Sequence, residues 1–193
     1  MTTSPLAMLD QSELLQLAIS SGQRNDAASS LIYLKEAVSR DDASPNAYLL
    51  LGAEYAEIGL YERAISAMEM ALQLDPDLPN ARLQLGLLVL SSGDGVKAET
   101  ILQPLAHITP GDAQTRFASG LIHLIHDEFD AALEQLSLGM VQNTVNPAMN
   151  QNMQKIIDGI NQLPPEVREQ AAAKANETQA QHVMLSAYTG TVH

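Results

Sequence analysis

Apolar residues between positions 44 and 79 recur at helical spacing in two consecutive blocks. The two apolar stripes are Tyr48, Leu51 and Tyr55, and then Ile65, Met68 and Leu72. Steps of three and four residues place such side chains on one face of an α-helix. Between the blocks Gly59 can adopt the left-handed backbone that ends a helix, and after them Pro76 cannot continue one. The pattern predicts a helical hairpin over residues 45–78.

The same pattern returns with a period of about 34 residues. Small residues recur at two of its positions, which are Gly52, Gly86 and Gly120, and Ala64, Ala98 and Ala132. A small side chain at such a point lets the two helices of a hairpin approach closely. The period predicts hairpins over residues 45–78, 79–112 and 113–146, and an irregular first hairpin over residues 11–44 in which Ser30 takes the place of the alanine.

The hairpin at 45–78 resembles the tetratricopeptide repeat, a family of stacked helical hairpins. The residues that carry the resemblance are Tyr48, Leu51, Gly52, Tyr55, Gly59, Tyr61, Ala64, Met68, Ala71, Leu72, Asp75 and Pro76. The match extends over 79–112 and 113–146, so it covers most of the chain up to Asn146. The resemblance implies an all-α fold, a right-handed α-solenoid of helix–turn–helix hairpins.

The segments outside the regular repeats need separate interpretations. Residues 1–10 are expected to be a flexible lead-in. Beyond the repeats, one apolar stripe comprises Met149, Met153, Ile156, Ile157 and Ile160. It predicts a capping helix over 147–163, followed by a C-terminal helix and tail over 164–193. Pro104 lies inside the expected second helix of its hairpin and predicts a kink or an early break there, because proline removes a backbone donor.

Composition narrows the classes of partner. The chain has 23 Asp and Glu against 10 Lys and Arg, a formal net charge of -13, which disfavours nucleic acids and anionic membranes because both are polyanions. Cysteine is absent, which removes disulfides and zinc–thiolate sites. No stretch approaches the roughly 18–20 apolar residues of a membrane span. The N-terminus has neither the basic start nor the apolar run of a secretory signal. We expect a soluble, cytoplasmic protein.

Catalytic signatures are scarce in this sequence. His123 and His126, followed by acidic residues at 127, 128 and 130, form the densest group of candidate metal ligands. The favoured interpretation is a partly buried His123 in the place of Tyr55 and an acidic turn, because a metal site needs more ligands than two histidines provide. No glycine-rich phosphate loop is present. We therefore expect no enzyme activity, no cofactor and no metal.

The first helix of each hairpin is expected to line a concave groove, and its lining is apolar. The predicted groove residues are Asn46, Leu49, Ala53, Asn80, Leu83, Leu87, Leu90, Gln114, Phe117, Leu121 and Leu124. Neighbouring groove positions are occupied by Ala56 and Glu57 in one hairpin and by Leu15 and Ile19 in the first. Packing within a hairpin need not bury these positions, so we expect something else to cover them.

The family resemblance implies that a protein or peptide binds in this groove. One subclass of the family grips a C-terminal carboxylate with Lys, Arg and Asn, and this chain departs from it. At the corresponding places it has Leu15, Ile19, Leu50, Gln114 and Ala118. An apolar lining fits an amphipathic helix or an extended hydrophobic segment better.

In size, acidity and repeat number the chain is similar to the tetratricopeptide chaperones of bacterial type III secretion. We therefore expect a non-catalytic interaction module: an adaptor, an assembly factor or a chaperone. The alternative is a structural or oligomerisation protein. Its groove would then be filled by its own C-terminal helix, 165–187, or by a second copy in a homodimer.

Overall fold

The computed structural model describes residues 5–107 and 111–173, and every regular element in that part of the chain is a helix. In chain order the elements are η1 (Pro5–Met8), α1 (Gln11–Gln23), α2 (Ala27–Val38), α3 (Pro45–Glu57), α4 (Tyr61–Leu74), α5 (Pro79–Ser91), α6 (Gly95–Leu102), η2 (Leu105–His107), α7 (Ala113–Ile125), α8 (Phe129–Gln142) and α9 (Pro147–Asn161). Residues 165–173 are helical as well. The chain divides into two compact units, Met1–Ile101 and Leu102–His193.

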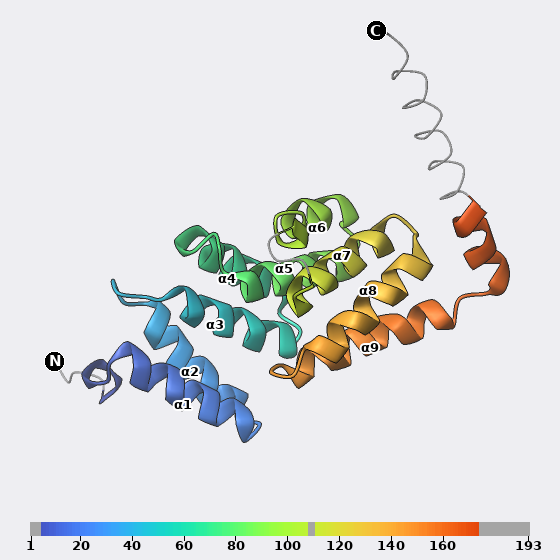
Figure 1. Ribbon diagram of the computed structural model, residues 1–193. Coiled ribbons are helices and arrows are strands. Elements are labelled where there is room, and N and C mark those ends of the chain that lie inside the picture. The colour runs from blue at the N-terminus through green and yellow to red at the C-terminus, as the bar shows by residue number, and fades with distance from the viewer. Residues whose placement is uncertain (1–4, 108–110, 174–193) are drawn as a thin grey trace, which may run out of the picture. The chain divides into compact units, whose positions relative to one another are not determined.

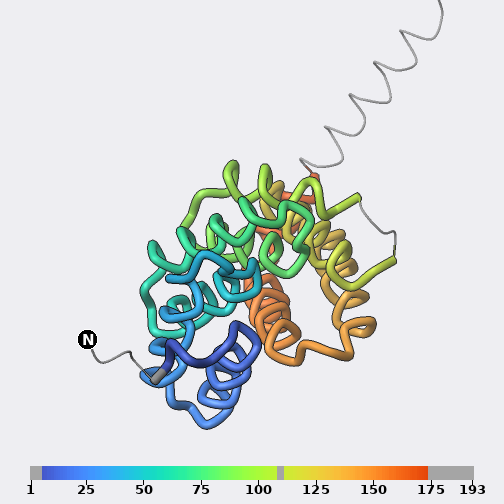
Figure 2. The backbone as a smooth tube through the Cα atoms, turned by 90° about the vertical axis from the view of Figure 1, so that its left-hand side faces the viewer, coloured from blue at the N-terminus to red at the C-terminus, as the bar shows by residue number. Residues whose placement is uncertain are grey.

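Consecutive helices pair as hairpins inside each unit (Figure 1, Figure 2). In the first unit α1 packs on α2 and α3 on α4, while the α2–α3 and α4–α5 contacts join one hairpin to the next. In the second unit α7 packs on α8, and α9 packs on α8. The prediction of an all-α fold built from helix–turn–helix hairpins is confirmed.

The hairpin turns place one residue each in the left-handed backbone region, at equivalent positions of successive repeats. These residues are Asn25 (φ 57°), Gly59 (φ 79°), Gly93 (φ 91°) and Asp127 (φ 60°). Glycine adopts this region at little cost, and asparagine and aspartate enter it more readily than other side chains. The period therefore continues through the first hairpin, whose turn has asparagine where the next two have glycine.

In the α3–α4 and α7–α8 hairpins the two helices approach closely at a glycine. A Cβ atom at Gly52 would lie 2.7 Å from Met68 Cγ and 3.1 Å from the carbonyl oxygen of Ala64. At Gly120 a Cβ atom would lie 2.7 Å from Leu136 Cδ2. The small residues expected at the equivalent facing position, Ser30, Ala64, Ala98 and Ala132, are all buried. Only very small side chains fit at these crossings.

Side chains cap the exposed backbone N–H groups at the starts of α1, α2 and α3. Asp10 and Glu13 form a capping box at α1, and Ser44 accepts a hydrogen bond from the third residue of its helix at α3. Asp26 caps α2 by accepting from the backbone N–H of Ser29 at 3.1 Å. Hydrogen bonds from the Ser29 side chain and backbone lower the pKa of the Asp26 carboxyl.

The third hairpin is shortened at its proline, as the sequence predicts. Helix α6 ends at Leu102, two residues before Pro104, and the 3₁₀ turn η2 follows from Leu105. An early helix end leaves backbone carbonyls without intrahelical partners. Arg82 Nη1 of α5 donates to one of them, the carbonyl of Ile101, at 3.3 Å. A side chain from the preceding helix thus compensates in part for the lost turn.

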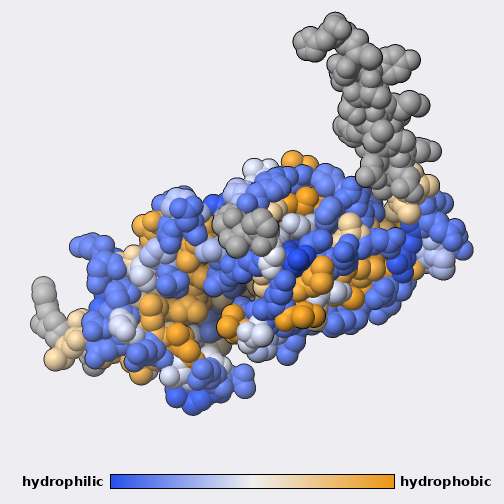
Figure 3. Space-filling view, viewed as in Figure 1, coloured by the Kyte–Doolittle hydropathy of each residue, from blue (hydrophilic) through white to orange (hydrophobic). Residues whose placement is uncertain are grey.

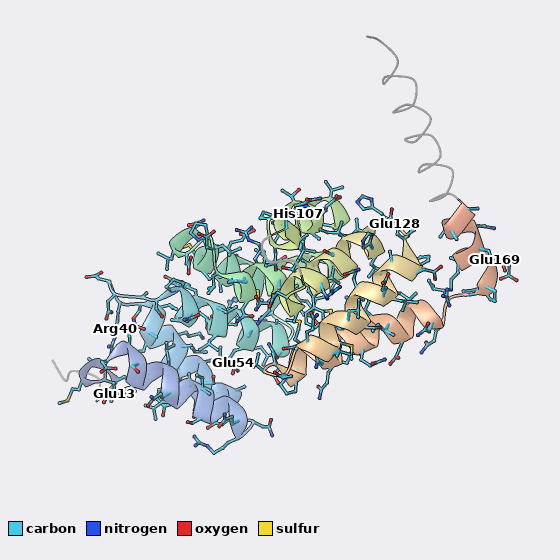
Figure 4. All side chains as sticks on the ribbon, viewed as in Figure 1. Glu13, Arg40, Glu54, His107, Glu128 and Glu169 are labelled. Atoms are coloured by element: carbon cyan, nitrogen blue, oxygen red, sulfur yellow. The ribbon has the colours of Figure 1, made fainter. Side chains whose placement is uncertain are left out.

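The N-terminal residues differ from the expected flexible lead-in. Residues Pro5–Met8 form η1, and Leu6 and Leu9 pack against a buried cluster at the end of the first hairpin. The Arg40 guanidinium, labelled in Figure 4, donates to the carbonyls of Leu6 (2.7 Å) and Leu9. Residues 5–9 are therefore held by Arg40, which follows α2, and by the buried cluster. Residues 1–4 lie outside the described residues, as do residues 174–193 of the expected C-terminal segment.

Helix α9 buries one stripe and leaves its other sides polar. The buried side chains are Met149, Met153, Ile157 and Ile160. An asparagine network closes the turn before it: Asn143 Nδ2 donates to Asn150 Oδ1 at 2.7 Å, and Asn150 Nδ2 donates to the carbonyl of Asn143 at 3.0 Å. A single apolar stripe with polar surroundings is the arrangement of a capping helix.

Four of the predicted groove residues belong instead to the core. Leu49 is 8% exposed, Leu83 and Phe117 are 1% exposed and Leu121 is fully buried, so the expectation that packing leaves these positions uncovered is wrong for them. Leu49 packs with Ala71 and Ala81 of the following helices. Phe117 fills the space over Gly139 of α8, where a Cβ atom would lie 2.7 Å from its ring. Large side chains here reach the neighbouring helices.

Gly52→Ala should lower the free energy of unfolding by about 1–3 kcal/mol, because its methyl group overlaps Met68 and the Ala64 carbonyl. Gly159→Ala in α9 is the matched control, since a Cβ atom there meets nothing within 4 Å. It should leave stability unchanged or raise it by up to about 1 kcal/mol through helix propensity. Urea unfolding followed by circular dichroism measures both, and equal losses would contradict the close approach at Gly52.

Leu83→Ala and Leu87→Ala compare two leucines one turn apart on α5. Leu83 is buried and Leu87 is half-buried. The Leu83 substitution should cost about 2–5 kcal/mol of unfolding free energy, because it opens a cavity, and the Leu87 substitution less than about 2 kcal/mol. Urea titrations of the two variants check this order, and a larger loss for Leu87 would show that the two burial assignments are reversed.

Candidate binding surface

The remaining predicted groove residues stay accessible, but they are divided between the two units. Ala53, Leu87 and Leu90 are half-buried and Asn46 and Asn80 are exposed, all in the first unit. Gln114 and Leu124 are half-buried in the second unit. A candidate surface that lies within one compact unit therefore uses α1, α3 and α5.

Five accessible apolar residues follow one another along these three helices. We call this set the front strip, and its members are Ile19, Ala53, Ala56, Leu87 and Leu90. Ile19, Ala53 and Leu87 occupy equivalent positions of three successive repeats, and Ala56 and Leu90 occupy a second set. Ile19 is 46% exposed. Figure 3 shows apolar side chains gathered on the face of the first unit between α1 and α3.

A polar contact links the first hairpin to the second. Ser30 of α2 is buried, and its hydroxyl donates to Glu54 Oε1 of α3 at 2.8 Å. A Cβ atom at Gly22 of α1 would lie 3.1 Å from the same carboxylate oxygen. Glu54 lies between α3 and the first hairpin in Figure 4. This contact fixes where α3 stands against α1 and α2, and so where Ala53 stands relative to Ile19.

Carboxylates lie at both ends of the helices that carry the front strip. The loops that precede α3 and α5 contain Asp41, Asp42, Asp75 and Asp77. The ends of α1, α3 and α5 and the turns that follow them contain Asp26, Glu57 and Asp94. Most of these side chains are exposed, and Asp26 and Asp75 are half-buried. The pKa shift of Asp26 is downward, so its carboxyl is ionised at neutral pH.

The arginines nearest to these carboxylates are directed at the protein itself. Arg40 donates to two N-terminal carbonyls and pairs with Glu36 at 3.2 Å. Arg82 donates to the carbonyls of Ile101 at 3.3 Å and Pro76 at 2.5 Å. Arg24, in the first hairpin turn, donates to the hydroxyl of Ser21 at 3.3 Å. Their hydrogen-bonding groups serve the fold, which leaves the ends of the strip with an excess of negative charge.

Three further cations lie on the second helices of the hairpins. Lys35 of α2 and Arg63 of α4 each lie 6.0 Å from the centroid of the Tyr55 ring. This distance is within the range of a cation–π contact. Lys97 of α6 pairs with Glu69 of α4 at 2.9 Å. These positive charges are therefore placed on helices that do not carry the front strip.

The histidine group does not form a metal site. His123 Nδ1 hydrogen-bonds Glu128 Oε2 across the α7–α8 turn, and His126 is the C-cap residue of α7. Among residues 5–107 and 111–173, no three side chains of the types His, Cys, Asp and Glu are grouped to hold a metal ion. Over the same residues, no helix has the length and apolar character needed to cross a membrane.

Sequence reasoning missed the residues that arrange the candidate surface. Arg40, Arg82 and Glu54 act on distant parts of the chain through backbone carbonyls or a single hydroxyl. Nothing in their local pattern distinguishes them from solvated surface charges. The one available signal was Ser30, a polar residue in a position where the other hairpins have alanine.

Comparisons with known proteins agree with the observed architecture. Residues 55–116 match the family profile of the tetratricopeptide repeat. No curated protein matches the chain significantly. A crystal structure of MamA is 25% identical with a TM-score of 0.58, and the match covers 69% of this chain and 78% of that one. MamA 41-end from Desulfovibrio magneticus RS-1 is 18% identical with a TM-score of 0.60, covering 92% and 98%.

The second MamA likeness, at 18% identity, is one of fold. The repeat period, the paired helices with their left-handed turn residues and the family profile all lead to one assignment. Residues 55–116 therefore belong to tetratricopeptide repeats, and the hairpins on either side repeat the same arrangement.

Proposed function

We propose that the protein is a non-catalytic interaction module that binds an apolar polypeptide segment on the front strip of its first unit. The observation that supports this is the run of accessible apolar side chains on α1, α3 and α5, which includes Ile19 at 46% exposure. Apolar residues repeated on successive hairpins form a continuous surface, and such surfaces are used for binding. An adaptor, an assembly factor or a chaperone working in the cytoplasm would use it in this way.

The size of the strip is sufficient for a weak affinity. Each leucine or similar side chain that a partner buries fully contributes roughly 1.5–3 kcal/mol. The three large side chains of the strip would contribute up to about 9 kcal/mol, from which the cost of association is subtracted, so the expected complex is weaker than about micromolar. Accessible Asn46 and Asn80, at the starts of α3 and α5, add hydrogen-bonding groups beside the apolar surface. An amphipathic helix matches this combination of contacts.

Leu87→Glu should reduce the partner captured by the purified full chain at least about tenfold, because a carboxylate would have to be buried without a donor. Val96→Glu is the matched control: Val96 is 80% exposed and lies on α6, away from the strip. Affinity capture with mass spectrometry compares the two variants with the unmodified protein, and circular dichroism checks their helix content. An unchanged capture profile for Leu87→Glu would contradict the proposal.

Sedimentation over a concentration series separates this role from oligomerisation. A monomer leaves the strip open to a partner. A dimer that Leu87→Glu dissociates and Val96→Glu does not would mean that a second copy covers the strip, and the structural role would replace the binding role.

A further inference from the structure

The charge around the front strip restricts what can bind there. Residues 1–101 contain 14 Asp and Glu against 6 Lys and Arg. The strip itself has no charged member, but the helices that carry it start and end beside carboxylates such as Asp77 and Glu57, both exposed. A segment lying along the strip would have these carboxylates close to it on either side. In that position they attract cations and repel anions at separations up to about a Debye length, ~10 Å.

The cations of the first unit are too few to neutralise these carboxylates, although Arg24 acts on Asp26. The guanidiniums of Arg40 and Arg82 are bound to backbone carbonyls, and Lys35 of α2 and Arg63 of α4 lie over the Tyr55 ring of α3. The loops and helix ends that flank α1, α3 and α5 therefore keep more carboxylates than cations. Arg24 is the cation that remains in the hairpin turns. Complementarity therefore requires positive charge from the partner.

The two internal candidates for the strip do not supply that charge. The chain's own residues 174–193 contain one lysine, Lys174, and one glutamate, Glu177. A second copy of the chain carries the same formal charge of -13 and would be repelled. An outside segment that carries lysine or arginine beside its apolar residues has neither disadvantage.

We propose that the partner of the front strip is a cationic amphipathic helix from another protein. Its apolar side chains cover Ile19, Leu87 and Leu90, and its lysines and arginines lie against the carboxylates at the two ends of α3 and α5. This inference rests on the proposed function, because it assumes that the strip is a binding surface, and it adds the chemical class of the partner.

Two synthetic amphipathic peptides, each about five helical turns long, test the inference. They have the same leucines at helical spacing and either lysine or glutamate at every other position. Fluorescence anisotropy measures their binding to the full chain. The lysine peptide should bind at least about tenfold more tightly than the glutamate peptide, and should weaken between about 50 and 200 mM salt. Failure of the lysine peptide to bind would overturn the inference.

Two pairs of variants separate the apolar contact from the charge. Leu87→Asn with Leu90→Asn should weaken the lysine peptide at least about tenfold by removing apolar contact. Glu57→Gln with Asp77→Asn should weaken it about fivefold. Glu62→Gln with Glu134→Gln removes the same charge from α4 and α8, and should change binding less than about twofold. Circular dichroism checks that each variant keeps its helix content.

The outcomes distinguish failure of the inference from failure of the proposed function. If both peptides bind equally and both are lost with the leucine pair, the strip binds apolar segments without charge selection, and only the inference falls. If the lysine peptide binds every variant equally, it is attracted to the acidic chain as a whole. The inference and the proposed function are then both wrong. Equal effects of the two carboxylate pairs would also overturn the inference.

Discussion

The close approach of the two helices in the α3–α4 and α7–α8 hairpins is the contact on which the rest of the structure depends. At Gly52 the α3 backbone lies so near to α4 that a single methyl group would overlap Met68 and the Ala64 carbonyl. Gly120 repeats this against Leu136 in the second unit. Because each hairpin is thin at this point, the next hairpin can pack against both of its helices. The first helices then stand side by side with their accessible residues in equivalent positions.

The same geometry explains why the first helices of the hairpins expose fewer apolar side chains than their sequences contain. Leu49 packs against Ala71 of its own hairpin and Ala81 of the next, and becomes part of the core. In the second unit Phe117 is buried against Gly139 of the partner helix in its own hairpin. What remains at the surface is a narrower set of residues, one helical turn further along each helix. The interior therefore determines the width of the binding surface.

Much of the fold is predictable because the hairpin is specified locally. Gly59 at a turn, Ala64 at a crossing and Pro104 as a helix breaker each act within a few residues, so a period read from the sequence predicts the helices. The left-handed turns at Asn25 and Asp127 follow from the same period, although neither residue is glycine. The interior positions of a repeat are therefore well determined by pattern alone.

The candidate site is less predictable, because burial of a front residue depends on the distance to the neighbouring hairpin. Leu83 and Leu87 are both leucines on one helix and differ only in what lies opposite them. The arginines raise the same difficulty, since the carbonyls that Arg40 binds are remote from it in the sequence. A pattern of residue types contains no information on such separations, whereas charge and apolar content already restrict the class of partner.

The Ser30–Glu54 hydrogen bond has a consequence for assembly of the array. Hairpins of similar shape can in principle stack in the wrong order during folding. Glu54 finds a hydroxyl donor only against the first hairpin, since the facing positions elsewhere are Ala64, Ala98 and Ala132. Against any of these its carboxylate would lose a partner and much of its water. The Ser30–Glu54 hydrogen bond thus makes a misordered stack of hairpins less favourable than the native one.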